Sequence, residues 1–376
     1  MNIPQKIDNI RKMDGLHIRK NHPIELIKNK IYECFDNEFI KFDHLNKEVS
    51  TVDNFDLLLI SKDHPARGLS DTYYLDENTV LRTHTSAHQN ELLKKGHTKF
   101  LVTGDVYRKD EINATHYPVF HQMEGVCLVE DNQDPVDELK KILTKIIDKL
   151  FPNCEYKMRD HHFPFTDPSF EIDVMYNGEW LEILGCGVIH QDILKHCNLE
   201  GRKGYAFGLG LERIAMILCN IDDIRYFWTD DERFHSQFST GELIKFNKYP
   251  ILQPVTKDYA FYVKDLDLTN INIKEFNKKP IEEKLDICGE EGSLRWMDQT
   301  RFFEICSEIC DNYVKEVTLF DVFIHPKDKL LSHAYHIVFE SIDQKFKDNA
   351  EFTKITNSYA LKIREKIGKE LNIESR

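Results

Sequence analysis

The chain has 376 residues, 41% of them hydrophobic and 30% charged, and no apolar run reaches the roughly 18 residues of a membrane span, so we expect a soluble globular protein. Its nine cysteines are odd in number, scattered and without a C-x-x-C pair, which argues against a disulfide framework or a zinc site. The net charge of −14 argues against nucleic-acid binding by the chain as a whole, but residues 248–376 hold 20 of the 50 basic and 23 of the 64 acidic residues and carry only −3.

The N-terminal part contains the first predicted helix. Residues 1–21 mix basic and acidic side chains and lack an apolar core, so they are not a secretory signal, whereas a transit peptide stays open. Within residues 22–35, Ile24, Ile27 and Ile31 follow helical spacing, and proline at position 23 suits a first turn. The pattern predicts an amphipathic helix at the start of a globular domain.

The next segments are typical of paired strands. Residues 100–108 and 119–128 are rich in strand-forming side chains and flank a polar loop. Residues 171–175 and 179–184 flank Asn177-Gly178, a sequence that favours a type I′ hairpin. We therefore expect a central antiparallel sheet.

Two helices are predicted beside this sheet. Asp134 followed by proline is typical of a helix start, and apolar residues continue from there at helical spacing. Residues 205–211 run through glycines into a second helical pattern at 212–218, a junction where backbone can approach a ligand closely. No G-x-G-x-x-G opens a βαβ unit, so Rossmann and P-loop folds are disfavoured.

The C-terminal part has a different order of elements. After Tyr249-Pro250 the patterns predict strands at 258–263, 314–324 and 334–340, with helices at 301–313 and 348–371. Residues 372–376 are available for a last strand. This β-α-β-β-α-β order is that of the ferredoxin-like fold, so the fold class we expect is α+β with two domains.

Several polar and aromatic residues of the first domain suit one chemistry. A carboxylate that attacks the α-phosphorus of ATP needs fixed positive charge there, which Arg108 at a strand end can supply. Phe120 and Arg213 can hold adenine between two flat groups. Gln122 and Glu124 lie two apart on one strand and so face one side, where they can accept hydrogen bonds from a buried ammonium group, with Ser86 nearby.

Each of these residues has a more ordinary alternative. A single arginine at a strand end is usually a solvated charge, and a Gln-x-Glu pair usually lies on an exposed face. The histidines also allow a metal cluster, but their spacing mixes strand and loop positions without a nearby acidic residue, so zinc is disfavoured. These histidines are His84, His88, His116 and His121.

Three stretches carry a family resemblance. The first is 103–108 (TGDVYR) with 116–125 (HYPVFHQMEG), the second is 207–213 (FGLGLER), and the third is 82–89 (RTHTSAHQ) with 162–171 (HFPFTDPSFE). They resemble motifs of the class II aminoacyl-tRNA synthetases, and the third resembles the phenylalanine enzymes in particular. From about residue 22 to the C-terminus the chain is similar to their single-chain organellar type.

The resemblance implies a function and a set of site residues. It implies ATP-dependent activation of phenylalanine and its transfer to tRNA(Phe), with Arg108 and Arg213 as catalytic residues and ATP and Mg²⁺ as cofactors. The implied ATP-binding residues are Arg108, Thr115, His116, Tyr117, Phe120, Glu182, which could also hold magnesium, and Arg213. The implied phenylalanine-binding residues are His84, Ser86, Ala87, His88, Gln89, Gln122, Met123, Glu124, Phe163, Phe165, Ala206 and Phe207.

The resemblance also implies a domain plan. We expect an N-terminal extension at 1–21, a catalytic domain at 22–239, a linker at 240–247 and an anticodon-binding domain at 248–376, whose individual tRNA contacts are not identified. Two departures from the family pattern occur in that last domain, namely His336 in place of a basic residue and an apparent insertion at 266–296. No editing domain is evident.

The expected partners are tRNA(Phe), phenylalanine and ATP, with no membrane, and we expect a monomer. The expected compartment is the mitochondrial matrix, with a plastid-type organelle or the cytoplasm as alternatives. Two rival functions stay open, a synthetase for another amino acid and a non-catalytic relative that binds only RNA or protein. The Phe-Pro-Phe segment at 163–165 disfavours the first, and the intact Arg108, Glu124 and Arg213 disfavour the second.

Overall fold

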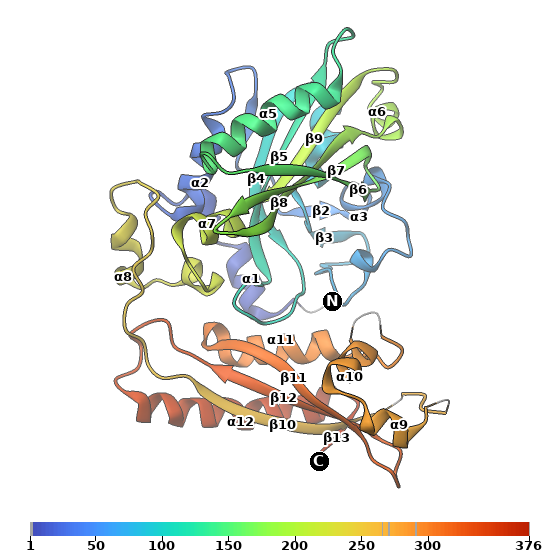
Figure 1. Ribbon diagram of the computed structural model, residues 1–376, viewed down its shortest axis with the longest axis vertical. Coiled ribbons are helices and arrows are strands. Elements are labelled where there is room, and N and C mark those ends of the chain that lie inside the picture. The colour runs from blue at the N-terminus through green and yellow to red at the C-terminus, as the bar shows by residue number, and fades with distance from the viewer. Residues whose placement is uncertain (1–2, 265, 270, 290–291, 376) are drawn as a thin grey trace.

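The computed structural model describes residues 3–264, 266–269, 271–289 and 292–375. Two separate sheets organise the chain, a seven-stranded sheet in the first part and a four-stranded sheet in the last part. A yellow segment that contains α8 (Glu232–His235) connects them at one side of the molecule (Figure 1). The α+β fold class expected from the sequence is confirmed.

The large sheet runs in the order β1-β4-β5-β9-β8-β7-β6. All its neighbours pair antiparallel except β1 and β4, which pair parallel, so the expected antiparallel arrangement is wrong at this one edge. The strands are β1 (Ile40–Phe42), β4 (Lys99–Tyr107), β5 (Val119–Val129), β6 (Tyr156–Phe163), β7 (Thr166–Tyr176), β8 (Glu179–Ile189) and β9 (Lys203–Gly210).

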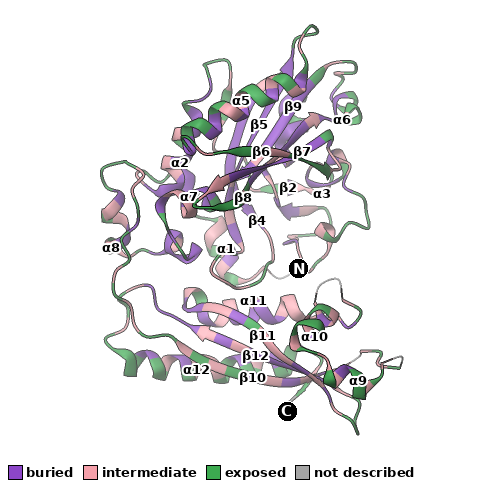
Figure 2. Ribbon diagram, in the orientation of Figure 1, coloured by how far each residue is buried: buried purple, intermediate pink, exposed green. Residues whose placement is uncertain are grey.

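Helices cover the two faces of this sheet unequally. On one face, α2 (Pro23–Tyr32), α5 (Pro135–Leu150) and α7 (Leu211–Cys219) bury the larger apolar cluster against the sheet. The other face carries a smaller cluster under α3 (Thr51–Asn54), α4 (Gln89–Lys94) and α6 (Gln191–His196), together with the two-stranded β2 (Glu48–Ser50) and β3 (Thr79–Leu81). The central strands are therefore buried along most of their length (Figure 2).

Local sequence signals explain several of these elements. Asp134 accepts hydrogen bonds from the backbone N–H groups of Val136 and Asp137 at 2.9 and 3.1 Å, which caps the start of α5. Asn177 and Gly178 have φ values of 51° and 87°, as a type I′ turn between β7 and β8 requires. Both predictions from the sequence are confirmed.

The small sheet has the order β11-β12-β10-β13, with every neighbouring pair antiparallel. This order, with one helix before β11 and one after β12, is the ferredoxin-like arrangement. Its main elements are β10 (Val255–Val263), α11 (Gln299–Cys310), β11 (Val314–Ile324), β12 (Leu331–Phe339), α12 (Asn349–Glu370) and β13 (Ile373–Ser375).

The described residues of the expected insertion at 266–296 contribute to a small separate apolar cluster. Positions 270, 290 and 291 of this segment lie outside the described residues. The segment contains α9 (Ile273–Lys278) and α10 (Ile281–Cys288). Phe276, Cys288 and Leu294 pack there against Val322 and Ile324 of β11. The segment is thus anchored to the small sheet.

The N-terminal residues join the first core. Helix α1 (Gln5–Arg11) buries Ile7, and Leu16 lies in the same apolar cluster as α2. The backbone N–H of Leu16 donates to Nε2 of His121 on β5 at 3.0 Å. No helix in the described part of the chain is both long enough and apolar enough to cross a membrane.

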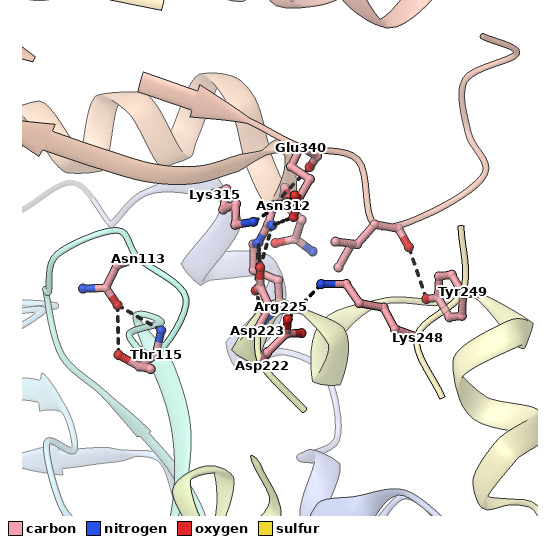
Figure 3. Close-up of polar contacts among 11 residues, drawn as sticks. Asn113, Thr115, Asp222, Asp223, Arg225, Lys248, Tyr249, Asn312, Lys315 and Glu340 are labelled. Carbon is pink, nitrogen blue, oxygen red and sulfur yellow. Dashed lines mark hydrogen bonds and ion pairs between the residues drawn. The ribbon is translucent and has the colours of Figure 1, made fainter. Parts of the chain in front are cut away.

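A buried arginine ties the two parts of the chain together (Figure 3). The Arg225 side chain is only 3% exposed and forms an ion pair with Asp223 at 2.7 Å and with Glu340 at 2.9 Å. It also donates to the backbone oxygens of Asn312 and Glu340 at 2.9 and 3.1 Å. Lys315 completes the cluster through Glu340 at 2.9 Å.

Candidate active site

A cavity of about 870 Å³ lies on the sheet face opposite α2, α5 and α7, and it extends to the C-terminal part. The alternation of β5 sets its polar wall, because Gln122 and Glu124 face the cavity while Met123 between them is buried in the larger cluster. The residues expected from the sequence that line it are His84, Ser86, Arg108, Thr115, His116, Tyr117, Phe120, Gln122, Glu124, Phe163, Phe165, Glu182, Ala206, Phe207 and Arg213.

A buried carboxyl group, that of Glu124, lines the cavity. Glu124 is 3% exposed, and its Oε2 atom has no hydrogen-bond partner among the described residues. Burial raises the pKa of Glu124 from 4.5 to about 7, against a smaller opposing effect of the Ser86 hydroxyl. An unsatisfied buried acceptor beside a cavity suits a cationic ligand group, such as an ammonium.

An apolar wall lies close to this carboxyl group. The rings of Phe163 and Phe165 stack 5.6 Å apart at an angle of 11°, and both line the cavity with Ala206. Gly185 makes this placement possible, because a Cβ atom there would lie 2.7 Å from the Phe163 ring. The wall offers aromatic contact to a flat apolar group.

A third part of the cavity carries arginines. Arg108 donates through Nε to the backbone oxygen of Thr83 at 2.8 Å, and its guanidinium lies 5.2 Å from the Phe120 ring centre. Arg213 at the start of α7 is 61% exposed and lies 3.9 Å from a carboxylate oxygen of Glu182. Both guanidinium groups are therefore available to an anionic or aromatic ligand.

The loop between β4 and β5 forms the rim. Thr115 and His116 are exposed, and Nδ1 of His116 lies 2.8 Å from Oδ1 of Asn113. The same oxygen accepts from the Thr115 backbone N–H at 2.9 Å (Figure 3). Tyr117 is buried, and its hydroxyl donates to Asn312 of the C-terminal part at 2.7 Å. Tyr117 thus lines the cavity, but its hydroxyl group is hydrogen-bonded to the C-terminal part and not directed to a ligand.

Two glycines of β9 leave room along the floor. Gly208 and Gly210 line the cavity, and a Cβ atom at either position would meet no protein atom within 4 Å. Packing within the protein therefore does not explain the glycines. They leave space where a ligand can lie against the backbone.

Four residues expected in the site do not line the cavity. Ala87 and Met123 belong to the two apolar clusters on opposite faces of the sheet. His88 points to Arg82, with Nε2 3.1 Å from the guanidinium, and Gln89 is 2% exposed at the start of α4. As for the histidines, the described residues contain no group of three or more His, Cys, Asp or Glu side chains placed to hold a metal ion.

Several further residues that line the cavity lie outside the motifs quoted from the sequence. His64 and Asp71 come from an irregular segment before β3, which has no periodicity to mark it. Arg295, Gln299, Thr300 and Phe303 come from the C-terminal part, more than 80 residues beyond Arg213, and only the docking of the two parts brings them to the cavity.

Comparison with known proteins gives a consistent result. Residues 6–238 match the family model described as tRNA synthetases class II core domain (F). The chain is 43% identical to the phenylalanine–tRNA ligase, chloroplastic/mitochondrial, of Arabidopsis thaliana, over 100% of this chain and 82% of that protein. It is 36% identical to the mitochondrial enzyme of Dictyostelium discoideum (96% and 86% covered) and 33% identical to that of Saccharomyces cerevisiae (96% and 89% covered).

Proposed function

The chain belongs to the class II tRNA synthetases and, within them, to the organellar phenylalanine–tRNA ligases, and from this premise we propose how its cavity works. The protein is an aminoacyl-tRNA ligase that joins phenylalanine to tRNA at the expense of ATP in an organelle. The mitochondrion is the compartment named for each of these relatives, and the Arabidopsis protein is also chloroplastic.

The reaction has two steps. A carboxylate oxygen of phenylalanine attacks the α-phosphorus of ATP, the bond from that phosphorus to the bridging oxygen breaks, and pyrophosphate leaves with the bonding electron pair. A hydroxyl of the 3′-terminal ribose of tRNA then attacks the carbonyl carbon and AMP leaves. Arg108 stabilises the charge that grows on the α-phosphate, and the protein needs no covalent nucleophile.

Phenylalanine binds between the carboxyl group and the aromatic wall. The ammonium group pairs with Glu124 and Gln122, and the phenyl ring packs against Phe163 and Phe165 above Ala206. The observation that carries this assignment is the unpaired Oε2 of Glu124, buried in a cavity whose adjacent wall is aromatic. A buried acceptor next to an apolar slot is complementary to a hydrophobic amino acid.

ATP occupies the arginine-lined part. Adenine lies between Phe120 and Arg213, which come from β5 and α7. One carboxylate fixes the distance between these elements, since Glu212 accepts from the backbone N–H of His121 at 2.7 Å and lies 2.6 Å from its Nδ1. Phe120 therefore lies next to His121, and Arg213 lies next to Glu212, the buried hydrogen-bonded partner of His121.

Class II synthetases use a divalent metal with ATP, and the residues present fit magnesium. Glu182 lines the cavity with a side chain that is 47% exposed and only a distant Arg213 contact. Magnesium commonly takes one or two carboxylates and completes its shell with phosphates and water. When bound through Glu182, it would neutralise phosphate charge while the arginines orient the nucleotide.

The remaining assignments concern the whole chain. We assign residues 22–239 to catalysis and 248–376 to the tRNA anticodon, with 240–247 as a linker and 1–21 as an extension that packs on the catalytic core, and we propose that the enzyme works as a monomer. Support comes from the separate sheets and apolar clusters of the two parts.

Amino-acid-dependent exchange of pyrophosphate into ATP tests the proposal, with each proteinogenic amino acid supplied in turn. We expect strong exchange with phenylalanine alone, followed by charging of organellar tRNA(Phe). Equal exchange with tyrosine would contradict the assignment of the aromatic pocket. Absence of exchange with every amino acid would contradict catalysis.

A further inference from the structure

The catalytic cavity has one wall that comes from the C-terminal part. Arg295 lies in the insertion at 266–296, and Gln299 and Thr300 begin α11. The catalytic residues proposed above all precede residue 240, so this wall has no role in that assignment. Its chemistry is that of a cation beside a helix start.

The Arg295 guanidinium has no partner among the residues that the structure describes, neither a carboxylate at ion-pair distance nor a hydrogen-bond acceptor. Two other cationic side chains that line the cavity do have partners. Arg108 donates to the Thr83 backbone at 2.8 Å, and Lys109 forms an ion pair with Glu304 at 3.1 Å. A half-buried guanidinium without a partner is suited to an anionic ligand.

The backbone around Arg295 is firmly held. Leu294 and Trp296 on either side are 2% and 3% exposed, and Trp296 packs against Phe261 of the small sheet with ring centres 5.1 Å apart. The N–H of Leu294 donates to the backbone oxygen of Ile287 at 2.9 Å. A backbone held on both sides of Arg295 needs little further ordering when a ligand binds there.

The start of α11 adds to the positive character of this wall. The helix has twelve residues and no acidic residue in its first turn, and its N-cap residue, Asp298, makes no side-chain cap hydrogen bond. The positive end of a helix favours anions, and here it lies beside a charged side chain. The described acidic groups that could compete for Arg295 are Asp298 and those that line the cavity, namely Asp71, Asp110, Glu111, Glu124, Glu171, Glu182 and Glu212.

We propose that Arg295 binds the β- and γ-phosphates of ATP, and the pyrophosphate that leaves, from the C-terminal side of the cavity. The proposal rests on the proposed function, because it names a further contact for the ATP of that reaction. Arg108 then faces the reacting α-phosphate, whereas Arg295 holds the leaving group. The insertion, which the family resemblance left without a role, gains one in nucleotide binding.

The test is phenylalanine-dependent exchange by the full chain without tRNA, in wild type, R295A and R295K. Loss of one charge-assisted contact should raise the KM for ATP and for pyrophosphate by about tenfold in R295A, with R295K intermediate and the KM for phenylalanine unchanged. The matched control is R301A, which removes an arginine of the same part that pairs with Glu308 and Glu370 outside the cavity. R301A should change the melting temperature but not the KM for ATP.

Three outcomes would overturn the proposal. One is an unchanged KM for ATP in a folded R295A protein, and another is weakened tRNA charging with normal exchange, which would assign Arg295 to RNA. The third is a lowered melting temperature in R295A without a KM effect, which would make the residue structural. Calorimetric binding of ATP alone to wild type and R295A separates this proposal from the proposed function, because it needs no amino acid.

Discussion

At the scale of single residues, Glu124 predicts a pH dependence. The carboxylate form must pair with the ammonium of phenylalanine, and the pKa of Glu124 in the free protein is about 7. The KM for phenylalanine should therefore rise as the pH falls below 7. E124Q should raise the KM by roughly 10- to 100-fold, as expected for a lost charge-assisted contact, and should abolish this acidic rise. Exchange kinetics between pH 6 and 8.5 would measure both effects.

The same group affects stability in the opposite sense to most carboxylates. Because its pKa is raised from 4.5 to about 7, the folded protein keeps a proton that the unfolded chain releases between these values. Its contribution to stability is thus present below pH 4.5 and lost as the pH rises through 7. E124Q should therefore be at least as stable as wild type at pH 8 in urea unfolding, and a clear destabilisation there would contradict the assignment.

Ala206 predicts side-chain specificity. It lines the cavity beside the Phe163 and Phe165 rings, and its own side chain is 7% exposed. A206G should enlarge the slot and allow exchange with para-halogenated phenylalanines, while tyrosine stays poor because its hydroxyl would be buried without a partner. If A206G excluded the analogues but kept phenylalanine activity, Ala206 would not form the floor.

Residue identities in the site could be predicted where the local pattern is regular. Gln122 and Glu124 followed from the alternation of one strand, and both line the cavity. Ala87, His88, Gln89 and Met123 were expected because they belong to the motifs that carry the family resemblance, but they are not among the residues that line the cavity. Adjacent residues of a strand or helical turn face different sides, so a contiguous motif names more residues than a pocket can use.

At the scale of elements, two glycines give a matched prediction. G185A places a Cβ atom 2.7 Å from the Phe163 ring, so the ring must move, and we expect a higher KM for phenylalanine and a lower melting temperature. G208A meets no protein atom within 4 Å, so its melting temperature should be nearly unchanged, and any loss should fall on ligand binding. Equal melting temperatures and equal kinetics for the two variants would contradict this distinction.

Long elements with regular patterns were predictable, and short or non-local ones were not. The strand expected at 314–324 is β11 (Val314–Ile324), and the helix expected from Asp348 is α12 (Asn349–Glu370). By contrast, β1 has three residues and pairs parallel with β4 across more than 50 intervening residues. Three residues carry too little periodicity to reveal either the strand or its direction.

At the scale of the whole molecule, the Arg225 cluster predicts how strongly the two parts are joined. R225M would leave Asp223 buried without a cation and Glu340 paired with Lys315 alone, and breaking a buried ion pair typically costs about 3–5 kcal/mol. We expect a lower unfolding midpoint in urea and faster proteolysis in 240–247. Adding D223N should recover part of the loss, because it removes the carboxylate that R225M leaves without a cation.

The control for R225M is a charge removed from the surface. K369M removes the ion pair between Lys369 and Glu365, whose side chains are 71% and 67% exposed. The unfolding midpoint in urea should therefore not change measurably. A similar effect of the two variants would show that Arg225 does not join the parts. Sequence could not predict this cluster, because its members come from two segments separated by more than 80 residues and none belongs to a motif.

The nine cysteines give the molecule a set of internal reporters. Eight are buried and Cys154 is partly buried, and all are free thiols. A thiol reagent should therefore modify Cys154 first, and the others only when the surrounding structure opens. Six lie in the first part and Cys288, Cys306 and Cys310 in the last, so the order of their modification maps which part opens first. The rate of thiol modification thus becomes a measure of local unfolding free energy for each part, obtained without any substitution.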